Sequence, residues 1–307
     1  MSTSKTTPRI FLIGANGQVG QAWRERFNDG SVVVQAIDRG SLDLQQTDWL
    51  ADRLYEYLQQ AQPTVIVNAA AYTAVDQAED EEHRAYDINA LAPGVIAEVA
   101  ARHGIPLIHY STDYVFDGQG EQPFQESDPT APLSVYGRSK LAGERAVQAA
   151  GGAHLIFRTS WVFGVHGQNF LKTMLRLAQK RDALSVVDDQ MGAPTSADLL
   201  VDIPWQMLQQ LKDPQDARWG LYHLCPTGYT SWYGYATYAI ERARKLGWPI
   251  KVAQQAIAPV ASSEFPVKAP RPHNSRLCTD KLQQTFGLTL PAWQAGVDQV
   301  LARLERP

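Results

Sequence analysis

The chain has 307 residues, of which 44% are hydrophobic and 20% are charged, and its formal net charge at pH 7 is −4. This hydrophobic fraction excludes an intrinsically disordered chain, and the lack of a basic excess argues against a nucleic-acid-binding protein. No apolar run approaches the roughly 20 residues that cross a bilayer, so we expect no membrane segment. The length predicts two domains, or one large α/β unit with an attached lobe.

The polar N-terminal segment MSTSKTTPR has no apolar core of a secretory signal, and we expect it to form a frayed tail. The only two cysteines, Cys225 and Cys278, are too few for a disulfide framework or a zinc cluster. Both are therefore expected to be reduced thiols, and the protein is expected in the cytoplasm.

In the first half of the chain, short β-branched runs alternate with longer amphipathic stretches. We predict strands at Arg9–Ile13, Val32–Ile37, Thr64–Val67, Pro106–Tyr110 and Leu155–Phe157. Helices are predicted near Val19–Phe27, Thr47–Ala61, Glu82–His103 and Tyr136–Ala149. Continuous apolar strands that alternate with helices indicate a parallel sheet covered on both faces. Residues 1–160 are thus predicted to form a doubly wound α/β (Rossmann) domain.

The second half is less regular. Further helices are predicted at Asn169–Arg181, around Ala197–Leu211 and from Ser231 to about Leu246, and strands at Leu184–Val187 and Leu221–Leu224. The proline-rich segment Pro259–Pro272 is expected to run as an extended surface loop. We therefore expect residues 161–307 to form a smaller C-terminal substrate-binding lobe, with segments at about 169–215 packing back on the first domain.

The first predicted strand is followed directly by GANGQVG, in which Gly14, Gly17 and Gly20 open a predicted helix. Glycines at this place permit a tight turn and a close approach to a pyrophosphate, which the helix N-terminus attracts. Asp38 directly follows the second predicted strand, at the place where a carboxylate binds the ribose of NADH. The adjacent Arg39 could instead bind the 2′-phosphate of NADPH, so both cofactors remain open.

Tyr136 and Lys140 lie four residues apart at the start of a predicted helix, so both side chains can face one point. An adjacent ammonium stabilises a phenolate, so we expect Lys140 to lower the pKa of Tyr136 toward neutrality. Thr112 follows a predicted strand at the sheet edge where ligands bind, and its hydroxyl can reach the same substrate oxygen. These three residues form the Ser/Thr–Tyr–Lys arrangement of the extended short-chain dehydrogenase/reductase superfamily.

Six stretches distributed along the chain narrow this resemblance. They are VNAAAYTAVDQAE (67–79), HYSTDYVF (109–116), VYGRSKLAGE (135–144), LIFRTSWVF (155–163), NFLKTMLRLA (169–178) and RPHNSRL (271–277). In this order they resemble the dTDP-4-dehydrorhamnose reductase family, including the C-terminal lobe. The resemblance implies hydride transfer from NADPH or NADH to C4 of dTDP-4-dehydro-L-rhamnose, the last step in making dTDP-L-rhamnose. It also implies a bacterial role in surface glycan (O-antigen) assembly.

The resemblance implies roles for individual residues. Tyr136 would protonate the C4 alkoxide, Lys140 would hold the nicotinamide ribose, and Thr112 would bind the carbonyl oxygen. With the glycine loop, the cofactor-binding set is Gly14, Gly17, Gln18, Val19, Gly20, Asp38, Arg39, Asp43, Leu44, Ala71, Tyr72, Thr73, Tyr110, Tyr136 and Lys140. The substrate-binding set is Thr112, Asp113, Trp161 and Arg271. Arg271 is included because an arginine in a proline-fixed loop suits a diphosphate.

Other interpretations stay open at this stage. Mg²⁺ is associated with family members, but no carboxylate motif designates ligands, and Glu79–Glu82 is better explained as a solvated helix start. A homodimer is an assembly to test for. An epimerase or dehydratase of nucleotide sugars would use the same superfamily arrangement. A non-catalytic regulatory subunit, like that of methionine adenosyltransferase, is the alternative from another class, although Thr112, Tyr136 and Lys140 are intact.

Overall fold

The computed structural model describes residues 7–305, so most of the polar N-terminal segment expected to fray lies outside the described residues. Its centre is a six-stranded sheet in the order β10, β5, β4, β3, β1, β2, in which every strand pair is parallel. The strands are β1 (Arg9–Ile13), β2 (Val33–Ile37), β3 (Val65–Asn68), β4 (Leu107–Thr112), β5 (His154–Thr159) and β10 (Gly220–His223). The predicted doubly wound α/β fold is confirmed.

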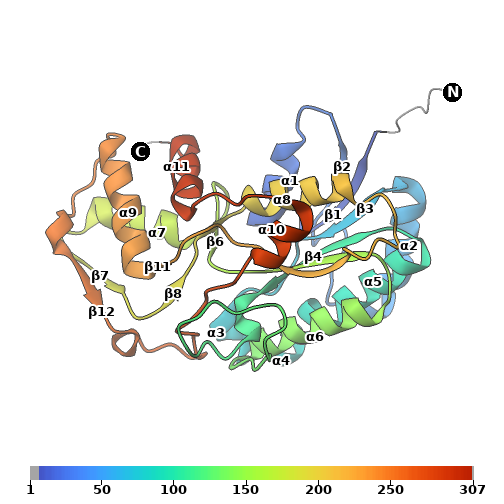
Figure 1. Cartoon of the computed structure of the whole chain (residues 1–307), viewed down its shortest axis with the longest axis horizontal. Helices are drawn as coiled ribbons and strands as arrows, with labels where there is room; N and C mark the ends of the chain where they lie inside the picture. The colour runs from blue at the N-terminus through green and yellow to red at the C-terminus, as the bar shows by residue number, and fades with distance from the viewer. Residues whose placement is uncertain (1–6, 306–307) are drawn as a thin grey trace.

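Helices cover both faces of this sheet (Figure 1). Helices α2 (Thr47–Ala61), α5 (Ala92–Arg102) and α6 (Val135–Ala149) cover one face, and α1 (Gln18–Arg26), α8 (Leu199–Gln210) and α10 (Asp280–Phe286) cover the other. Successive strand residues point to opposite faces. In β1, Ile10 and Leu12 pack toward α1 and α8, whereas Phe11 and Ile13 pack toward α2 and α5. Strands β1 and β3 are mostly apolar because both of their faces are buried.

The helix predicted at Glu82–His103 is interrupted. The structure has α4 (Glu82–Tyr86), a π-helical turn at Asp87–Leu91, and then α5. The turn packs directly against α6, where a Cβ atom on Gly143 would lie 2.0 Å from the Asn89 carbonyl oxygen. Single π-helical turns inside α-helices are frequent at functional sites. This turn holds a buried asparagine next to the helix of Tyr136 and Lys140.

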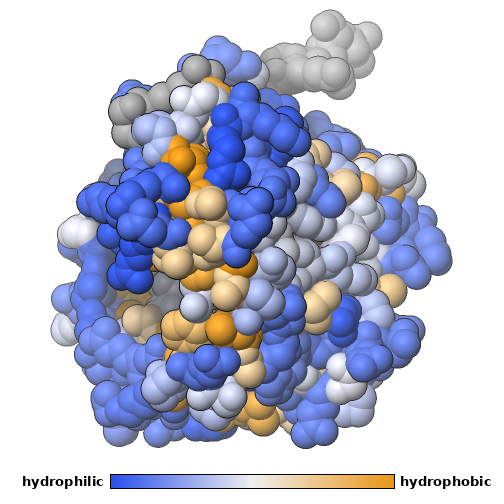
Figure 2. All heavy atoms as spheres, turned by 90° about the vertical axis from the view of Figure 1, so that its left-hand side faces the viewer, coloured by the Kyte–Doolittle hydropathy of each residue, from blue (hydrophilic) through white to orange (hydrophobic). Residues whose placement is uncertain are grey.

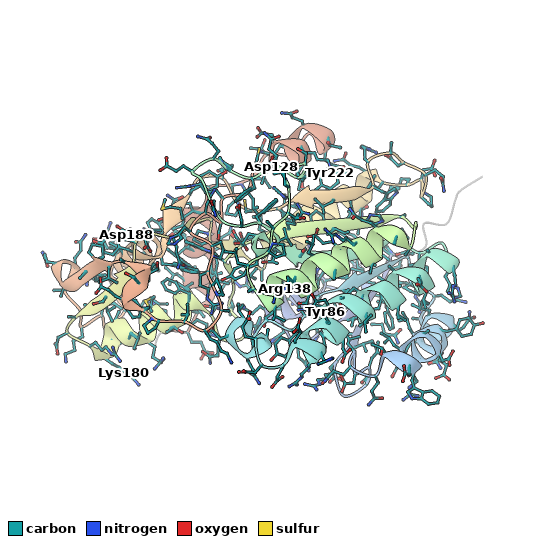
Figure 3. The ribbon with its side chains drawn as sticks, turned by 90° about the horizontal axis from the view of Figure 1, so that it is seen from below. Tyr86, Asp128, Arg138, Lys180, Asp188 and Tyr222 are labelled. Atoms are coloured by element: carbon teal, nitrogen blue, oxygen red, sulfur yellow. The ribbon has the colours of Figure 1, made fainter. Side chains whose placement is uncertain are left out.

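The lobe lies at one end of the carboxyl edge of the sheet (Figure 1). Its helices are α7 (Phe170–Lys180), α9 (Trp232–Lys245) and α11 (Trp293–Arg303). Its short strand pairs are β7 (Leu184–Val187) with β12 (Ile257–Val260), β8 (Met191–Gly192) with β11 (Thr230–Ser231), and β6 (Val162–Phe163) with β9 (Thr195–Ser196). In Figure 3, Lys180 and Asp188 lie on this lobe, far from Tyr222 on β10. Figure 2 shows its outer face, which is mostly hydrophilic with a band of hydrophobic residues.

Three short segments complete the description. Helix α3 (Val75–Ala78) follows β3, and single 3₁₀ turns occur at Asp113–Val115, Gln254–Ala256 and Ser262–Glu264. The proline-rich segment Pro259–Pro272 is largely extended as expected, but its start belongs to β12, which pairs with β7. No helix among residues 7–305 is long and apolar enough to cross a membrane.

Segments from the second half of the chain contribute to both parts of the molecule. Helix α8 packs on α1 beside the sheet, whereas α7 packs on α9 in the lobe. Strand β10 pairs with β5 at the edge of the sheet, and helix α10 packs on β10. The division of the chain into domains at residue 160 stays a prediction.

Candidate active site

The glycine loop lies between β1 and α1, at the carboxyl edge of the sheet. Gly14 has φ of +82°, and a Cβ atom on it would lie 2.5 Å from the backbone nitrogen of Ala70. Only glycine fits this turn. Gly17 has no side chain to cap α1, which leaves N–H groups of its first turn available to an anion. Gln18 and Val19 form that turn, and Gly20 is buried behind it. The loop therefore fits a pyrophosphate.

The carboxylate after β2 lies beside a short turn. Ser41 donates to Asp38 Oδ1 from its backbone nitrogen and its hydroxyl, both at 3.0 Å, and these bonds lower the pKa of Asp38. The Arg39 side chain is 63% exposed, donates to Gln45 at 2.7 Å, and has its Nε 3.6 Å from Asp43 Oδ1. Two carboxylates, Asp38 and Asp43, and the exposed Arg39 therefore lie close together after β2. Leu44, the last member of the cofactor-binding set in this region, is buried.

The loop after β3 is fixed by a residue that the sequence analysis missed. Asn89 accepts a hydrogen bond from the Tyr72 nitrogen at 2.8 Å and donates to the Tyr72 oxygen at 3.0 Å. It also donates to the Ser139 hydroxyl at 3.1 Å. Ala71 and Thr73, on either side of Tyr72, stay exposed at the rim. The signal available in the sequence was a polar residue on the apolar run Ile88–Leu91.

The three predicted catalytic residues come together. Thr112 ends β4, while Tyr136 and Lys140 lie one turn apart on α6, which Ser134 caps by accepting from the Gly137 nitrogen at 3.1 Å. Thr112 lies beside the Tyr136 hydroxyl. Lys140 is 2% exposed, and its Nζ donates to the Tyr110 carbonyl oxygen at 2.6 Å. A phenol, a hydroxyl and an ammonium thus share one corner of the sheet edge.

The expected lowering of the Tyr136 pKa is wrong for this structure. Burial raises the pKa of Tyr136 to about 12, hydrogen bonding to Thr112 opposes that rise, and Asp113 adds to it. Burial also lowers the pKa of Lys140 to about 8, against the attraction of Glu144. The spacing of four residues placed both groups on one face, but the ammonium binds the Tyr110 carbonyl and desolvation dominates. Tyr136 is accordingly a protonated acid at neutral pH.

Asp113 follows Thr112 and is 3% exposed. Burial raises its pKa to about 6, while Ser275 and Thr112 beside it lower the pKa. The hydroxyl of Thr112 donates to Asp113 Oδ1 at 3.1 Å. Its Oδ2 has no hydrogen-bond partner among the described residues. This buried carboxylate oxygen, close to the Tyr136 hydroxyl, can still accept a hydrogen bond.

Arg271 lies in the segment that returns from the lobe to α3. Its Nη2 donates to Asp76 Oδ2 at 2.6 Å, while its buried Nη1 has no hydrogen-bond partner in the described part of the chain. Burial raises the pKa of the neighbouring Tyr114, and the Arg271 charge opposes that rise. The Tyr114 ring meets the Tyr136 ring edge-on, with centroids 5.4 Å apart. The Tyr114 side chain therefore connects Arg271 with Tyr136.

Trp161 and Tyr110, which are predicted to contact the substrate and the cofactor respectively, lie in different parts of the molecule. Trp161 stacks on Trp232 of α9 with ring centroids 3.6 Å apart, so it lies where the lobe meets the sheet edge. The Tyr110 hydroxyl accepts from Trp23 Nε1 at 2.9 Å and donates to the Leu200 oxygen at 2.5 Å. These bonds hold the Tyr110 side chain between α1 and α8. Its backbone carbonyl, which Lys140 binds, is the part that faces the site.

No group of three or more histidine, cysteine, aspartate or glutamate side chains within residues 7–305 could hold a metal ion. The acidic run at 79–82 is engaged in structural bonds: Glu79 accepts from the Val135 nitrogen at 2.8 Å, and Glu81 accepts from Tyr72 at 3.0 Å and Arg84 at 2.7 Å. The donor groups among the described residues therefore do not fit a Mg²⁺ site.

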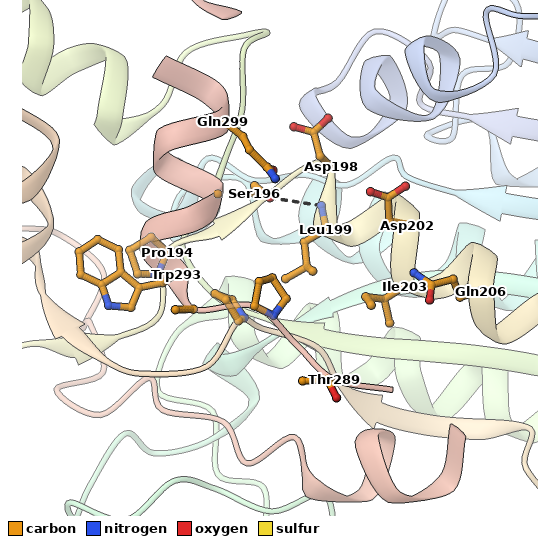
Figure 4. A pocket seen from close by; sticks show the side chains of 14 residues that line it. Pro194, Ser196, Asp198, Leu199, Asp202, Ile203, Gln206, Thr289, Trp293 and Gln299 are labelled. Carbon is orange, nitrogen blue, oxygen red and sulfur yellow. Dashed lines mark hydrogen bonds between the residues drawn. The ribbon is translucent and has the colours of Figure 1, made fainter. Parts of the chain in front are cut away.

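A separate pocket of about 210 Å³ lies between α8 and α11 (Figure 4). Asp198, Asp202 and Trp293 are among its lining residues. The Ser196 hydroxyl at its edge accepts from the Leu199 nitrogen at 3.2 Å. Both acids are already paired, Asp198 with Arg303 and Asp202 with Arg26. The pocket does not contain Tyr136 or Lys140.

Comparisons with known proteins show the family of the chain. A family model described as "RmlD substrate binding domain" matches residues 8–306. The dTDP-4-dehydrorhamnose reductase of Escherichia coli (strain K12) is 46% identical over 301 residues, covering 96% of this chain and 97% of that protein. The dTDP-4-dehydrorhamnose reductase of Burkholderia thailandensis is 43% identical over 293 residues, covering 94% and 96% of the two chains.

Solved structures agree in fold. The crystal structure of dTDP-4-dehydrorhamnose reductase from Bacillus anthracis in complex with NADP has a TM-score of 0.88 and 33% identity, covering 97% of this chain and 100% of that one. The UDP-glucose 4-epimerase of Thermus thermophilus in complex with NAD has a TM-score of 0.73 at 16% identity, covering 96% and 98%. The latter likeness shows the fold alone.

Proposed function

Because the chain belongs to the dTDP-4-dehydrorhamnose reductase family, we propose that Tyr136, Lys140 and Thr112 carry its reductase activity on dTDP-4-dehydro-L-rhamnose. The product, dTDP-L-rhamnose, completes the biosynthesis of that nucleotide sugar. The single observation that carries the assignment is the meeting of a protonated phenol, a hydroxyl and a buried ammonium at the carboxyl edge of the sheet. This edge is where open α/β sheets bind ligands.

In the proposed reaction, the C4 carbonyl oxygen lies between the hydroxyl groups of Thr112 and Tyr136. The reduced nicotinamide, when bound, supplies the hydride to C4. As negative charge develops on the oxygen, the Tyr136 hydroxyl gives it a proton, and the carbonyl becomes an alcohol. The resulting Tyr136 phenolate must then regain a proton before the next turnover. The proton comes from a group whose pKa of about 12 keeps it protonated at neutral pH.

The residues of this chain also bind and orient. Gly14, Gly17 and the first turn of α1 would hold the cofactor pyrophosphate, and Lys140 would donate to the nicotinamide ribose. Asp113 would accept from a sugar hydroxyl through its Oδ2 atom, which has no partner among the described residues. The buried Arg271 Nη1 offers a charged donor to the substrate, whose diphosphate is the matching acceptor. Trp161 would contact the substrate from the lobe side.

NADPH is the proposed preferred cofactor. The Asp38 carboxylate already accepts two hydrogen bonds from Ser41, which reduces its availability to a ribose hydroxyl. Arg39 is exposed and can turn toward a 2′-phosphate at the cost of a hydrogen bond to Gln45 and a long ion pair with Asp43. An arginine at this place is the usual partner of that phosphate.

Location and assembly stay predictions. A cytoplasmic location rests on the two cysteines, both of which are free thiols. A homodimer would be tested by sedimentation of the purified protein. The proposed binding partner is the nucleotide-sugar substrate, for which Asp113 and Arg271 offer an acceptor and a charged donor.

The test is oxidation of NADPH and NADH by the purified protein with dTDP-4-dehydro-L-rhamnose made in situ. We expect Tyr136→Phe to lower kcat by at least about 100-fold, as loss of a general acid does, while the Kd for NADPH changes less than about twofold. Turnover of Tyr136→Phe within about threefold of the unmodified protein would overturn the assignment. Arg138→Gln, an exposed change on the same helix, is the control.

A further inference from the structure

A buried ion pair lies one helical turn beyond Lys140. Glu144 of α6 is 1% exposed and Arg158 of β5 is 4% exposed. Arg158 donates from Nε to Glu144 Oε1 at 2.9 Å and from Nη2 to Oε2 at 2.7 Å, a two-pronged geometry. Burying two charges costs more than such a pair usually returns in stability. A pair of this kind therefore calls for an explanation other than stability.

The same carboxylate connects the elements that carry the catalytic residues. Glu144 Oε1 also accepts from the Ser111 hydroxyl at 2.5 Å, and Ser111 directly precedes Thr112 on β4. Glu144 lies four residues after Lys140, on the same face of α6. One side chain thus ties α6 to β4 beside Thr112 and to β5. The position of α6 on the sheet edge, and with it the position of Lys140, depends on these bonds.

The negative charge of Glu144 also stabilises the buried Lys140 ammonium, which desolvation disfavours. Glu144 on the same helix and His109 on β4 interact electrostatically with Lys140, and Arg158 on β5 pairs with Glu144. Tyr136 lies one turn before Lys140 on α6, and Asp113 beyond β4 acts on Tyr136. His109 is neutral, because burial lowers its pKa well below the usual value. Of this set, Glu144 is the negative charge that raises the pKa of Lys140, while desolvation lowers it.

We propose that Glu144 is a positioning residue, held by Arg158 and Ser111, that keeps the buried Lys140 side chain both in place and protonated for cofactor binding. The inference rests on the role proposed above for Lys140. His223 of β10 is the neighbour of Arg158 in the adjacent strand. Its pKa falls to about 3 because of burial and the Arg158 charge, so it adds no competing positive charge.

The experiment is the pH profile of kcat/KM for NADPH. In the unmodified protein we expect a decrease above about pH 8, where Lys140 loses its proton. In Glu144→Gln the carboxylate charge is gone, so we expect the decrease to begin about one pH unit lower, roughly a tenfold change in the proton affinity of Lys140. Ser111→Ala keeps the charge and removes one contact, so it should retain the original profile. Glu98→Gln, an exposed change on α5, is the control.

The outcomes separate the alternatives. An unchanged profile in Glu144→Gln, or the same shift in Ser111→Ala, would overturn the role of the Glu144 charge. A profile in Lys140→Ala like that of the unmodified protein would overturn the proposed role of Lys140 itself. If Glu144→Gln does not fold because Arg158 is left alone, the double variant Glu144→Gln/Arg158→Met removes both charges. A shift in the same direction but smaller is expected there, because removal of Arg158 also removes a positive charge. The absence of any shift contradicts the inference.

Discussion

The Asn89 side chain donates a hydrogen bond to the Ser139 hydroxyl at 3.1 Å, and Ser139 in turn donates to the Tyr136 backbone oxygen at 2.9 Å. The π-helical turn is therefore joined to the helix of Tyr136 and Lys140. Because Asn89 also binds both backbone groups of Tyr72, the cofactor loop and the catalytic helix share one buried amide. A single side chain fixes their relative position.

We expect Asn89→Ala to weaken both stability and catalysis. The change leaves the buried backbone nitrogen and oxygen of Tyr72 without their Asn89 partners, at a cost of about 1–3 kcal/mol for each group. The Ser139 hydroxyl loses a donor but keeps its bond to the Tyr136 oxygen. The loop at Ala71–Thr73 should loosen, so the KM for NADPH should rise along with a fall in kcat of about tenfold. Thermal unfolding and steady-state kinetics measure the two effects, with Asn28→Ala, an exposed asparagine, as the control. Activity equal to that of the control would contradict the positioning role.

Asp113→Asn should stabilise the protein at neutral pH while reducing its activity. The folded-state pKa of about 6 lies above the ordinary value of 3.8, so Asp113 favours folding below pH 4 and this contribution is lost as the pH rises through 6. The shift corresponds to about 3 kcal/mol at most. Asparagine has no charge to bury. The Tm difference between the variant and the unmodified protein should therefore be larger at pH 7.5 than at pH 4, and a pH-independent difference would contradict the assignment.

Arg271→Gln should raise the KM for the nucleotide sugar by about 10- to 100-fold, because a charge-assisted hydrogen bond contributes about 1.5–3 kcal/mol. The KM for NADPH should change little. Lys268→Gln is the matched control, since Lys268 lies in the same segment and pairs with Asp80 at an exposed position. An equal rise in both variants would mean that the segment, and not the guanidinium, is what the substrate requires.

Arg39→Ala should raise the KM for NADPH by about tenfold and leave the KM for NADH within about twofold, because only the 2′-phosphate needs the guanidinium. Asp38→Ala should have the reverse preference and weaken NADH binding more. Fluorescence titration with each cofactor measures both variants. Equal effects on the two cofactors would show that neither residue reads the 2′ position.

The sequence by itself determined the order of elements and the type of chemistry. The strand at Arg9–Ile13 and the helix at Thr47–Ala61 have in the structure the bounds that the sequence predicts, because their apolar spacing is local. The glycine loop, Thr112, Tyr136 and Lys140 follow from fixed positions at strand ends and helix starts. Such positions are set by the chain direction in a parallel sheet.

Only the tertiary structure decided which distant residues meet. The pairing of β10 with β5, the bonds from Asn89 to Tyr72, and the burial of Glu144 against Arg158 join segments far apart in the sequence. The direction of the Tyr136 pKa shift was likewise decided by the tertiary structure. The spacing of Tyr136 and Lys140 places them on one face, but desolvation depends on everything packed around them. Local patterns encode elements, whereas burial is a property of the whole fold.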